Sequence, residues 1–541
     1  MFALPRTSKL LTCLLILQAA SFLGSMLQAQ TTDYITYHFD NARDGLNPNE
    51  TILTPANVNV SNFGKVGFYA LDGKVDAQPL YLSKVPIAGG THNVLYAVTE
   101  HDSVYALDAD TGSILWTKSM LKAGEKPSDN HGCSQISPEI GITATPVIER
   151  LSSGFGTIFV VAMSKDASGA YHQRLHALNI VTGSEMEGGP AEITASYPGT
   201  GEFSVNGKQI FEPGQYAERV GLLLMNGAIF MGWTSHCDID PYTGWLMMYD
   251  AHTLRQRSVL NLTPNGADAP HYQGGEGSIW MAGSGLAGDA QGNVYFLDAN
   301  GIFDSTLNSS GFPIGGDYGN AFMKVSSARG RLRAIDYFST WDTLDRSLAD
   351  QDLGSGGVLL LPDMKDANGV TRHLAVGQGK IGNFYIVDRD NMGKFNPATN
   401  NIYQEVDRAN SAEFGMPAYF NGTLYYGGSN NVLRAFAFES ARLNPNWTSQ
   451  TVVSFPYPGT TPGISANGTR NGIVWAVENT SPAVLHAYDA ANLANELYNS
   501  NQASNGRDNF GNGNKFITPT IVNGKVFVGT PSGVAVFGLL K

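Results

Sequence analysis

Polar and ionisable side chains recur at one point of a repeating pattern, directly after short apolar runs rich in Val, Ile, Phe and Tyr. At such positions a histidine or aspartate can accept a proton from a hydroxyl group, and a lysine can pair with an anionic ligand. The catalytic candidates are His101, Asp102 and His236, and the other candidates at the same point are Lys165, Asn300, Lys380 and Glu478. This mixture suits an anionic or polyhydroxylated ligand.

A second set of candidates lies in the stretches that lead into apolar runs, and it includes Glu276, Trp280 and Lys515. Trp280, like Trp233 at the end of an apolar run, has a flat ring that can stack on a planar cofactor or a sugar. Structural roles compete with the functional ones at every position. The tryptophans can pack between strands, His101 can form a hydrogen-bonded turn, the lysines can be solvated, and Asn300 can be a turn residue.

The elements that must position these side chains are strands, because the composition disfavours helices. Charged residues make up 15% of the chain, and the 62 glycines are well above the usual share of about 7%. Few charged helical surfaces and many glycine turns favour strands joined by tight loops. The net charge of −13 repels phosphate backbones, so the sequence predicts no nucleic-acid binding.

A repeat organises the strands, with a middle strand followed by a partner strand in each of eight units. The dipeptides Asp72-Gly73, Asn226-Gly227, Asn421-Gly422 and Asn523-Gly524 are typical of hairpin turns. The middle strands are expected at 94–98, 158–162, 229–232, 294–297, 374–377, 424–427, 473–476 and 526–529. Their partners are expected at 104–108, 175–179, 245–249, 322–325, 384–387, 433–436, 485–488 and 534–537.

Radial repetition of such units predicts an all-β fold, an eight-bladed β-propeller with four-stranded antiparallel blades. Seven blades are the alternative count, and a linear solenoid is the rival architecture. The last strand, 534–539, is expected to pair with 34–39 and so close the ring. In a propeller the loops that follow the middle strands lie on one face, which would bring the candidate residues together.

The chain begins with features of an export signal. Arg6 and Lys9 precede a mostly apolar stretch, residues 10–27, and Ala29 ends a small-residue cleavage site. The sequence therefore predicts a signal peptide over 1–29, a propeller over 30–541, and a secreted or periplasmic protein. No later stretch resembles a transmembrane helix.

Two cysteines, Cys133 and Cys237, remain beyond the predicted signal peptide. An oxidising compartment favours a disulfide between them. The alternative is a metal site formed with His131 and His236, but these pairs lack the close ligand spacing of known zinc sites.

The segment Tyr105-Ala-Leu-Asp-Ala-Asp-Thr-Gly-Ser-Ile-Leu-Trp116 resembles the repeat of pyrroloquinoline-quinone (PQQ) dehydrogenases, within the quinoprotein-like β-propeller family. The resemblance implies eight blades, PQQ and Ca²⁺ as cofactors, and oxidation of a sugar or an alcohol. Under it, Lys165, Trp233, Trp280, Lys380, Glu478 and Lys515 are cofactor-binding candidates, and Glu276 and Asn300 are metal candidates. Adjacent cysteines, which methanol-type members contain, are absent, as is a Cys-x-x-Cys-His haem sequence.

The same repeat also occurs in outer-membrane assembly scaffolds that hold no cofactor, so repeat and function are separate questions. The leading hypothesis is an exported PQQ- and Ca²⁺-dependent oxidoreductase with a small-molecule or carbohydrate ligand on the propeller face. The alternative is a non-catalytic scaffold with a protein partner, or a glycan-binding module. A third hypothesis is a polysaccharide lyase or hydrolase, although no nucleophile elbow, Walker loop or metalloprotease motif appears.

Overall fold

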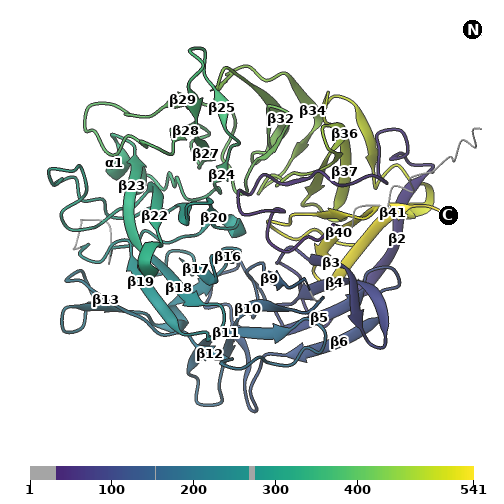
Figure 1. Cartoon of the computed structure of the whole chain (residues 1–541), viewed down its shortest axis with the longest axis horizontal. Coiled ribbons are helices and arrows are strands. Elements are labelled where there is room, and N and C mark those ends of the chain that lie inside the picture. Colours follow the sequence, from purple (N-terminus) through teal and green to yellow (C-terminus); the bar gives the residue numbers. More distant parts are fainter. Residues whose placement is uncertain (1–31, 153, 267–274) are drawn as a thin grey trace, which may run out of the picture. The chain divides into compact units, whose positions relative to one another are not determined.

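The computed structural model describes residues 32–152, 154–266 and 275–541. Over these residues the chain forms eight antiparallel sheets arranged around a common centre, which confirms the eight-bladed propeller (Figure 1). The predicted signal peptide, residues 1–29, lies outside the described residues. No helix among the described residues has the length and apolar character to cross a membrane.

The first four blades follow one another along the chain. Blade 1 contains β3 (Leu80–Ile87), β4 (Gly90–Val98), β5 (Ser103–Asp108) and β6 (Ile114–Ser119). Blade 2 contains β9 (Val147–Arg150), β10 (Gly156–Lys165), β11 (Tyr171–Asn179) and β12 (Ala191–Glu192), with β7 (Lys126–Asp129) and β8 (Glu139–Ile140) added to the sheet. Blade 3 contains β15 (Tyr216–Glu218), β16 (Leu223–Met225), β17 (Ala228–Ser235), β18 (Trp245–Asp250) and β19 (Gln256–Asn261). Blade 4 contains β20 (Ala287–Gly288), β21 (Asn293–Leu297), β22 (Ala321–Ser326) and β23 (Arg333–Ser339).

The remaining blades complete the ring. Blade 5 contains β24 (Leu359–Leu360), β27 (Leu374–Gln378), β28 (Phe384–Asp388) and β29 (Gln404–Val406). Blade 6 contains β30 (Ala418–Phe420), β31 (Thr423–Tyr426), β32 (Asn431–Glu439), β33 (Arg442–Leu443) and β34 (Ser449–Phe455), and blade 7 contains β35 (Gly463–Asn467), β36 (Arg470–Glu478), β37 (Val484–Asp489) and β38 (Glu496–Asn499). Blade 8 contains β39 (Thr520–Val522), β40 (Lys525–Thr530), β41 (Gly533–Leu539) and β2 (Phe63–Ala70).

Other elements decorate the loops. They are the hairpins β13 (Ser196–Pro198) with β14 (Lys208–Ile210) and β25 (Met364–Lys365) with β26 (Thr371–Arg372), the helix α1 (Thr343–Leu348), and the short 3₁₀ turns η1 (Pro213–Gln215), η2 (Met281–Gly283), η3 (Ala328–Gly330) and η4 (Ser504–Gly506).

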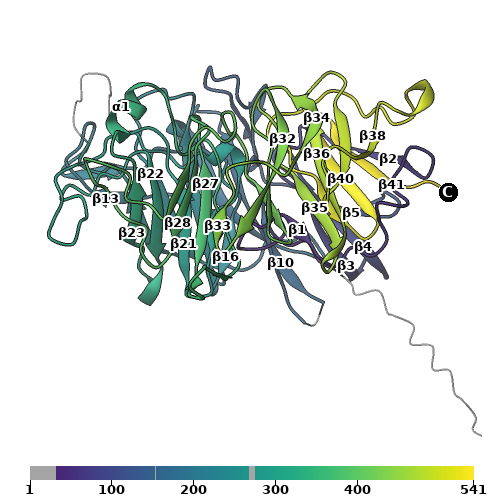
Figure 2. The same cartoon turned by 90° about the horizontal axis from the view of Figure 1, so that it is seen from above.

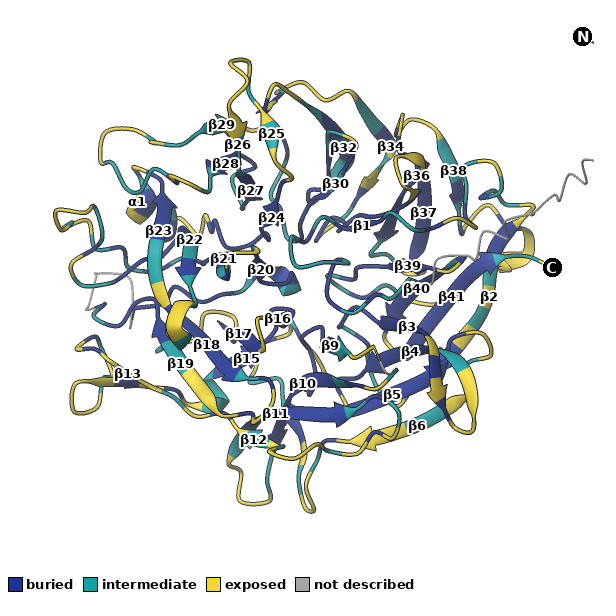
Figure 3. Ribbon diagram, in the orientation of Figure 1, coloured by how far each residue is buried: buried dark blue, intermediate teal, exposed yellow. Residues whose placement is uncertain are grey.

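Every predicted pair of middle and partner strands is present. These strands are buried between neighbouring blades. The apolar run of β10 is buried along its length, whereas the outer strand β6 is largely exposed (Figure 3). Strands covered on both faces need continuous apolar sequence, which made them recognisable. The Asn-Gly dipeptides at 226, 421 and 523 form tight hairpins with positive φ at both residues. Asp72-Gly73 forms a bend and no hairpin.

The ring is closed by a different strand from the one predicted. The outer strand of blade 8 is β2, which pairs with β41 in the order β2–β41–β40–β39. Residues 34–39 do not pair with β41; they belong to a segment, residues 33–50, that runs close to the inner strands of the blades. We call this segment the N-terminal strap. Figure 2 shows the ring edge-on, with the N-terminal part of the chain in purple.

The N-terminal strap contacts all eight blades. Its β1 (Leu46–Asn47) runs parallel to β35, and the fully buried Arg43 donates to the carbonyls of Leu222 and Leu286. Other hydrogen bonds join the strap to Tyr81, Ile148, Gly288, Leu360, Tyr419, Ile464 and Ile521. Tyr37 lies at the centre, where its hydroxyl is 3.2 Å from Thr518 Oγ1. The strap therefore fills the middle of the ring from one side.

Candidate functional site

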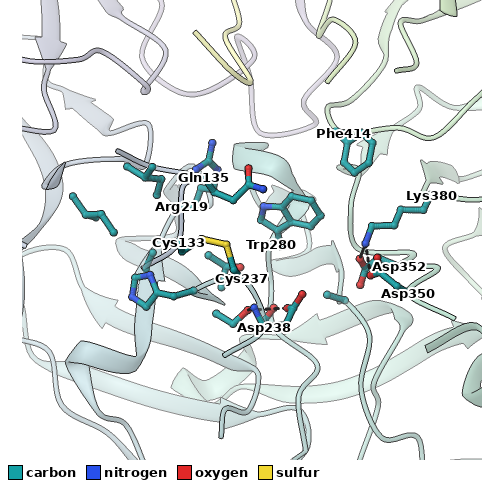
Figure 4. Close-up of a pocket in the computed structure, with 18 of the residues that line it drawn as sticks. Cys133, Gln135, Arg219, Cys237, Asp238, Trp280, Asp350, Asp352, Lys380 and Phe414 are labelled. Atoms are coloured by element: carbon teal, nitrogen blue, oxygen red, sulfur yellow. Dashed lines mark hydrogen bonds and ion pairs between the residues drawn. A yellow bond between two sulfur atoms is a disulfide. The ribbon is translucent and has the colours of Figure 1, made fainter. Parts of the chain in front are cut away.

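A cavity of about 470 Å³ opens on the face of the ring away from the strap (Figure 4). Its lining comes from the loops that follow the middle strands and from the loops that enter the first strands, as the propeller pattern predicts. Its ionisable lining residues are Arg219, His236, Asp238, Asp350, Asp352 and Lys380. Loops from seven blades line the cavity or lie at its border, so residues distant in sequence converge here.

Four aromatic side chains form a closed ring of contacts beside the cavity. The Trp280 ring centroid is 5.9 Å from that of Phe414 and 6.3 Å from that of Phe516. Tyr457 completes the ring, at 5.2 Å from Phe414 and 6.4 Å from Phe516. Flat rings at such distances offer a stacking surface for a planar ligand.

Arg219 is a buried cation without a hydrogen-bonded partner. Its side chain lines the cavity and lies 4.6 Å from the centre of the Phe516 ring, and its Nε is buried with no acceptor. Burial lowers the pKa of Arg219, and the nearby Asp76 and Glu100 oppose this effect. A buried donor without an acceptor is costly, so the unsatisfied Nε favours a ligand that carries an anionic acceptor.

Lys380 lies at another wall of the cavity and is already neutralised. Its Nζ pairs with Asp350, and is 2.6 Å from Asp352 Oδ2. Burial opposes the lysine's charge, but the two aspartates outweigh burial and raise its pKa. Figure 4 shows this cluster on the opposite side of Trp280 from Arg219.

The predicted disulfide is present and lines the cavity. Cys133 and Cys237 are bonded, with 5.6 Å between their Cα atoms, which excludes the alternative of a site with thiolate metal ligands. His236 stacks on His131 with 4.1 Å between ring centroids, and its Nε2 is buried without a partner. Burial, followed by the neighbouring His131, lowers the pKa of His236 to about 4. The ring is therefore neutral at pH 7, and one nitrogen is available as an acceptor.

The predicted metal candidates lie together next to the Lys380 cluster. The backbone N–H of Asn300 donates to Asp352 Oδ1 at 2.7 Å, its Nδ2 donates to Asp350, and its Oδ1 is buried without a partner. Burial, followed by the charges of nearby aspartates, raises the pKa of Glu276 to about 9. Among the described residues, however, no group of three His, Cys, Asp or Glu side chains is arranged to hold a metal.

The structure brings some of the predicted residues together and leaves others apart. His236, Trp280 and Lys380 line the cavity, while Lys515 borders it, with its Nζ 3.4 Å from Gln135 Oε1 and 5.6 Å from the Tyr457 ring. Trp233 is fully buried and donates to Gln173. The four remaining candidates do not line the cavity: His101 bonds Glu139, Asp102 is fully buried, Lys165 pairs with Asp129, and Glu478 bonds His486.

Arg219, Asp350 and Asp352 were not among the sequence candidates. Arg219 falls between β15 and β16, in the stretch that enters the first strand of blade 3. Trp280 and Lys515 were chosen as candidates because they lie at the same kind of position. A charged residue at this position was the signal that could have identified Arg219. The two aspartates follow α1, an element that the repeat does not contain.

The comparisons with known proteins agree with this fold. No protein-family model matches the chain. The chain is 22% identical over 405 residues to the quinate/shikimate dehydrogenase (quinone) of Acinetobacter baylyi, a match that covers 71% of this chain and 47% of that protein. The chain therefore spans about half the length of this curated relative.

Solved structures share the ring. A quinohemoprotein alcohol dehydrogenase from Comamonas testosteroni superposes with a TM-score of 0.60 at 15% identity, over 94% of this chain and 80% of that one. A europium-containing methanol dehydrogenase gives a TM-score of 0.60 at 12% identity, over 94% and 98% of the two chains. At such identities the structural likeness shows the fold. Together with the curated match, it agrees with the resemblance of the repeat to quinoprotein-like β-propellers.

Proposed function

We propose that the protein is a PQQ-dependent oxidoreductase that oxidises a hydroxyl group of an alcohol or a sugar. The observation that carries the proposal is Arg219, a buried cation whose Nε has no acceptor and which lines a 470 Å³ cavity beside Trp280. PQQ is planar and carries carboxylates, so it matches both a flat aromatic wall and a guanidinium with an unsatisfied donor. The curated relative is named as a quinone-linked dehydrogenase, which supports the same class.

The residues present fit the cofactor. Arg219 would hold a carboxylate, Trp280 would cover one flat face, and the Cys133–Cys237 disulfide provides a further wall. When bound, PQQ would supply a two-electron acceptor for the oxidation. Lys380 contributes less to anion binding, because two aspartates already compensate its charge.

The oxygen donors around Asn300 would supply only part of a Ca²⁺ site, because the described residues include no group of three acidic, His or Cys side chains arranged around a metal. Ca²⁺ prefers carboxylate and amide oxygens, and Asn300 Oδ1 is a buried acceptor without a partner. Asp352 accepts from the Asn300 N–H, and burial, followed by the charges of nearby aspartates, raises the pKa of Glu276 to about 9. A divalent cation would relieve this repulsion.

His236 is the group best placed to receive the proton of the substrate hydroxyl. It lines the cavity, it is neutral at pH 7, and its Nε2 has no partner among the described residues. A base must lie within hydrogen-bond reach of the proton that it accepts, and His236 could accept one without breaking an ion pair.

Calorimetric titration of PQQ into the purified protein, with Ca²⁺ present, tests the proposal. We expect saturable binding that is weakened in Arg219→Gln, followed by dye-linked activity on a panel of alcohols and sugars. Absence of PQQ binding to the folded protein would overturn the proposal and favour the alternative, a non-catalytic scaffold or glycan-binding propeller.

We also propose export to the periplasm or the medium, with cleavage after Ala29. The charged, apolar and small-residue parts of residues 1–29 support it, as does the disulfide, since such bonds persist in oxidising compartments. Mass spectrometry of the protein recovered outside the cytoplasm should give a chain that starts at Gln30. An intact N-terminus would contradict the proposal.

A further inference from the structure

A second cavity, of about 610 Å³, lies on the face of the ring opposite the candidate site. It is bounded by the N-terminal strap and by turns of blades 4 and 5 that follow their first and third strands. Turns after the first and third strands lie on the other face from those that follow the middle strands. No residue lines both cavities.

One wall carries two carboxyls that form no ion pair at salt-bridge distance with a described residue. Asp40 and Asp44 come from the strap, and Asp40 Oδ1 accepts from the backbone N–H of Asp44 at 3.3 Å, so the two groups are neighbours. Neither carboxyl forms an ion pair with a described residue. The Arg43 guanidinium, whose charge opposes the rise in the pKa of Asp40, donates its hydrogen bonds to carbonyls and to Thr36. Burial, followed by the charge of Asp40, raises the pKa of Asp44 to about 8, so Asp44 ionises fully at pH 7 only when a cation lies beside it.

The walls formed by the blades carry cations that lack close carboxylate partners. Arg389 Nε is buried with no acceptor, and the nearest carboxylate oxygen paired with its guanidinium, on Asp363, is 3.9 Å away. Lys324 donates to the carbonyl of Arg389 and forms no ion pair with a described residue. His373, in contrast, is already bonded to Asp390 at 2.8 Å.

These charges do not neutralise one another, because they are fixed on different elements of the cavity wall. Strap hydrogen bonds to Gly288 and Leu360 hold Asp40 and Asp44 in place, and Arg389 and Lys324 are held by blades 4 and 5. A simple cation would leave Arg389 and Lys324 uncompensated, and a simple anion would leave the two carboxyls uncompensated. A ligand that carries both charges satisfies both walls.

We propose that this cavity binds a small zwitterion with a free ammonium and a free carboxylate group, such as an amino acid or a short peptide. The ammonium lies against Asp40 and Asp44, and the carboxylate lies against Arg389 and Lys324. The volume falls within the range of small-molecule sites, roughly 300–1,000 Å³, and leaves room for more than one residue. The proposal does not depend on the function proposed for the other cavity.

The test is calorimetric titration of the full-length protein with glycine, diglycine and triglycine, which place the two charges at increasing separations. We expect saturable binding of at least one of them. We further expect Asp44→Asn and Arg389→Gln each to weaken that binding about tenfold or more, because each removes a charge-assisted contact. Asp390→Asn is the matched control, since Asp390 lines the same cavity but already bonds His373, and it should leave the affinity unchanged.

Thermal unfolding of each variant shows whether a loss of binding reflects a loss of folding. Methylamine and acetate present one charge each and should bind far more weakly than the zwitterion. The proposal is overturned if none of the three zwitterions binds the folded protein, if methylamine or acetate alone binds as tightly, or if the folded Asp44→Asn and Arg389→Gln variants bind as the parent does.

Discussion

The two cationic walls of the candidate site differ in what surrounds the charge. Lys380 is held by Asp350 and Asp352, whereas Arg219 lies against Phe516 and has no acceptor for its Nε. Both residues line the same cavity, and both are partly or fully withdrawn from water. The difference shows that a positive side chain in a pocket predicts anion binding only when carboxylates do not already compensate its charge. Under the proposed function Arg219 would therefore hold the anion, while Lys380 is paired with the two aspartates.

The largest effect on PQQ binding is expected from removing the charge of Arg219. We expect Arg219→Gln to weaken PQQ binding about 100-fold, because charge-assisted hydrogen bonds in a buried site are worth about 1.5–3 kcal/mol. Calorimetry with Ca²⁺ present measures the effect. Lys165→Gln is the control, since Lys165 pairs with Asp129 away from the cavity. Equal losses in the two variants would contradict the assignment.

Removing the disulfide loosens the wall that contains Cys133 and Cys237. The double variant Cys133→Ala, Cys237→Ala should lower the free energy of unfolding by about 2–4 kcal/mol, because the bond closes a long loop in the unfolded chain. Chemical denaturation measures this change. PQQ affinity should fall less than in Arg219→Gln, and a larger fall would show that the disulfide itself carries the binding.

Removing the charge of Lys380 tests whether this lysine also contributes to PQQ binding. Lys380→Gln should weaken PQQ binding by less than about tenfold, since the lysine's charge is already compensated by carboxylates. It should lower the thermal midpoint instead, because Asp352 is buried and loses its cation. A loss of affinity as large as that of Arg219→Gln would mean that both walls hold the cofactor equally.

A further prediction concerns the pH dependence of stability at Glu276. The pKa of Glu276 is about 9 in the folded protein and 4.5 ordinarily, so the folded state holds this proton more tightly than the unfolded state. The contribution to stability is fully present below about pH 4.5 and is lost as the pH rises towards 9. Glu276→Gln should flatten the fall of the thermal midpoint over this range, whereas an unchanged profile would contradict the shift.

Much of the fold could be predicted from the sequence because blade strands are covered on both faces and read as apolar runs. Of the candidate positions after these runs, His236 and Lys380 line the cavity. The repeat pattern did not indicate the length of each strand. Lys165 and Lys380 occupy the same point of the repeat, but β10 continues through Lys165, which pairs towards Asp129, while β27 ends at Gln378 and frees Lys380 to reach the cavity. Pairing of charges across loops, as at Lys380, depends on α1 and other insertions outside the repeat.

The closure of the ring by β2 has a consequence for how the protein is made. The outer strand of blade 8 comes from near the beginning of the chain and its partner β41 from the end, so this sheet waits for the last residues to be synthesised. The strap likewise needs every inner strand before its hydrogen bonds are complete. Contacts this distant in sequence make folding slow. A chain in which β41 has not yet been synthesised therefore carries open sheet edges at β2 and β40, and a deletion of β41 would leave these two strands without their shared partner.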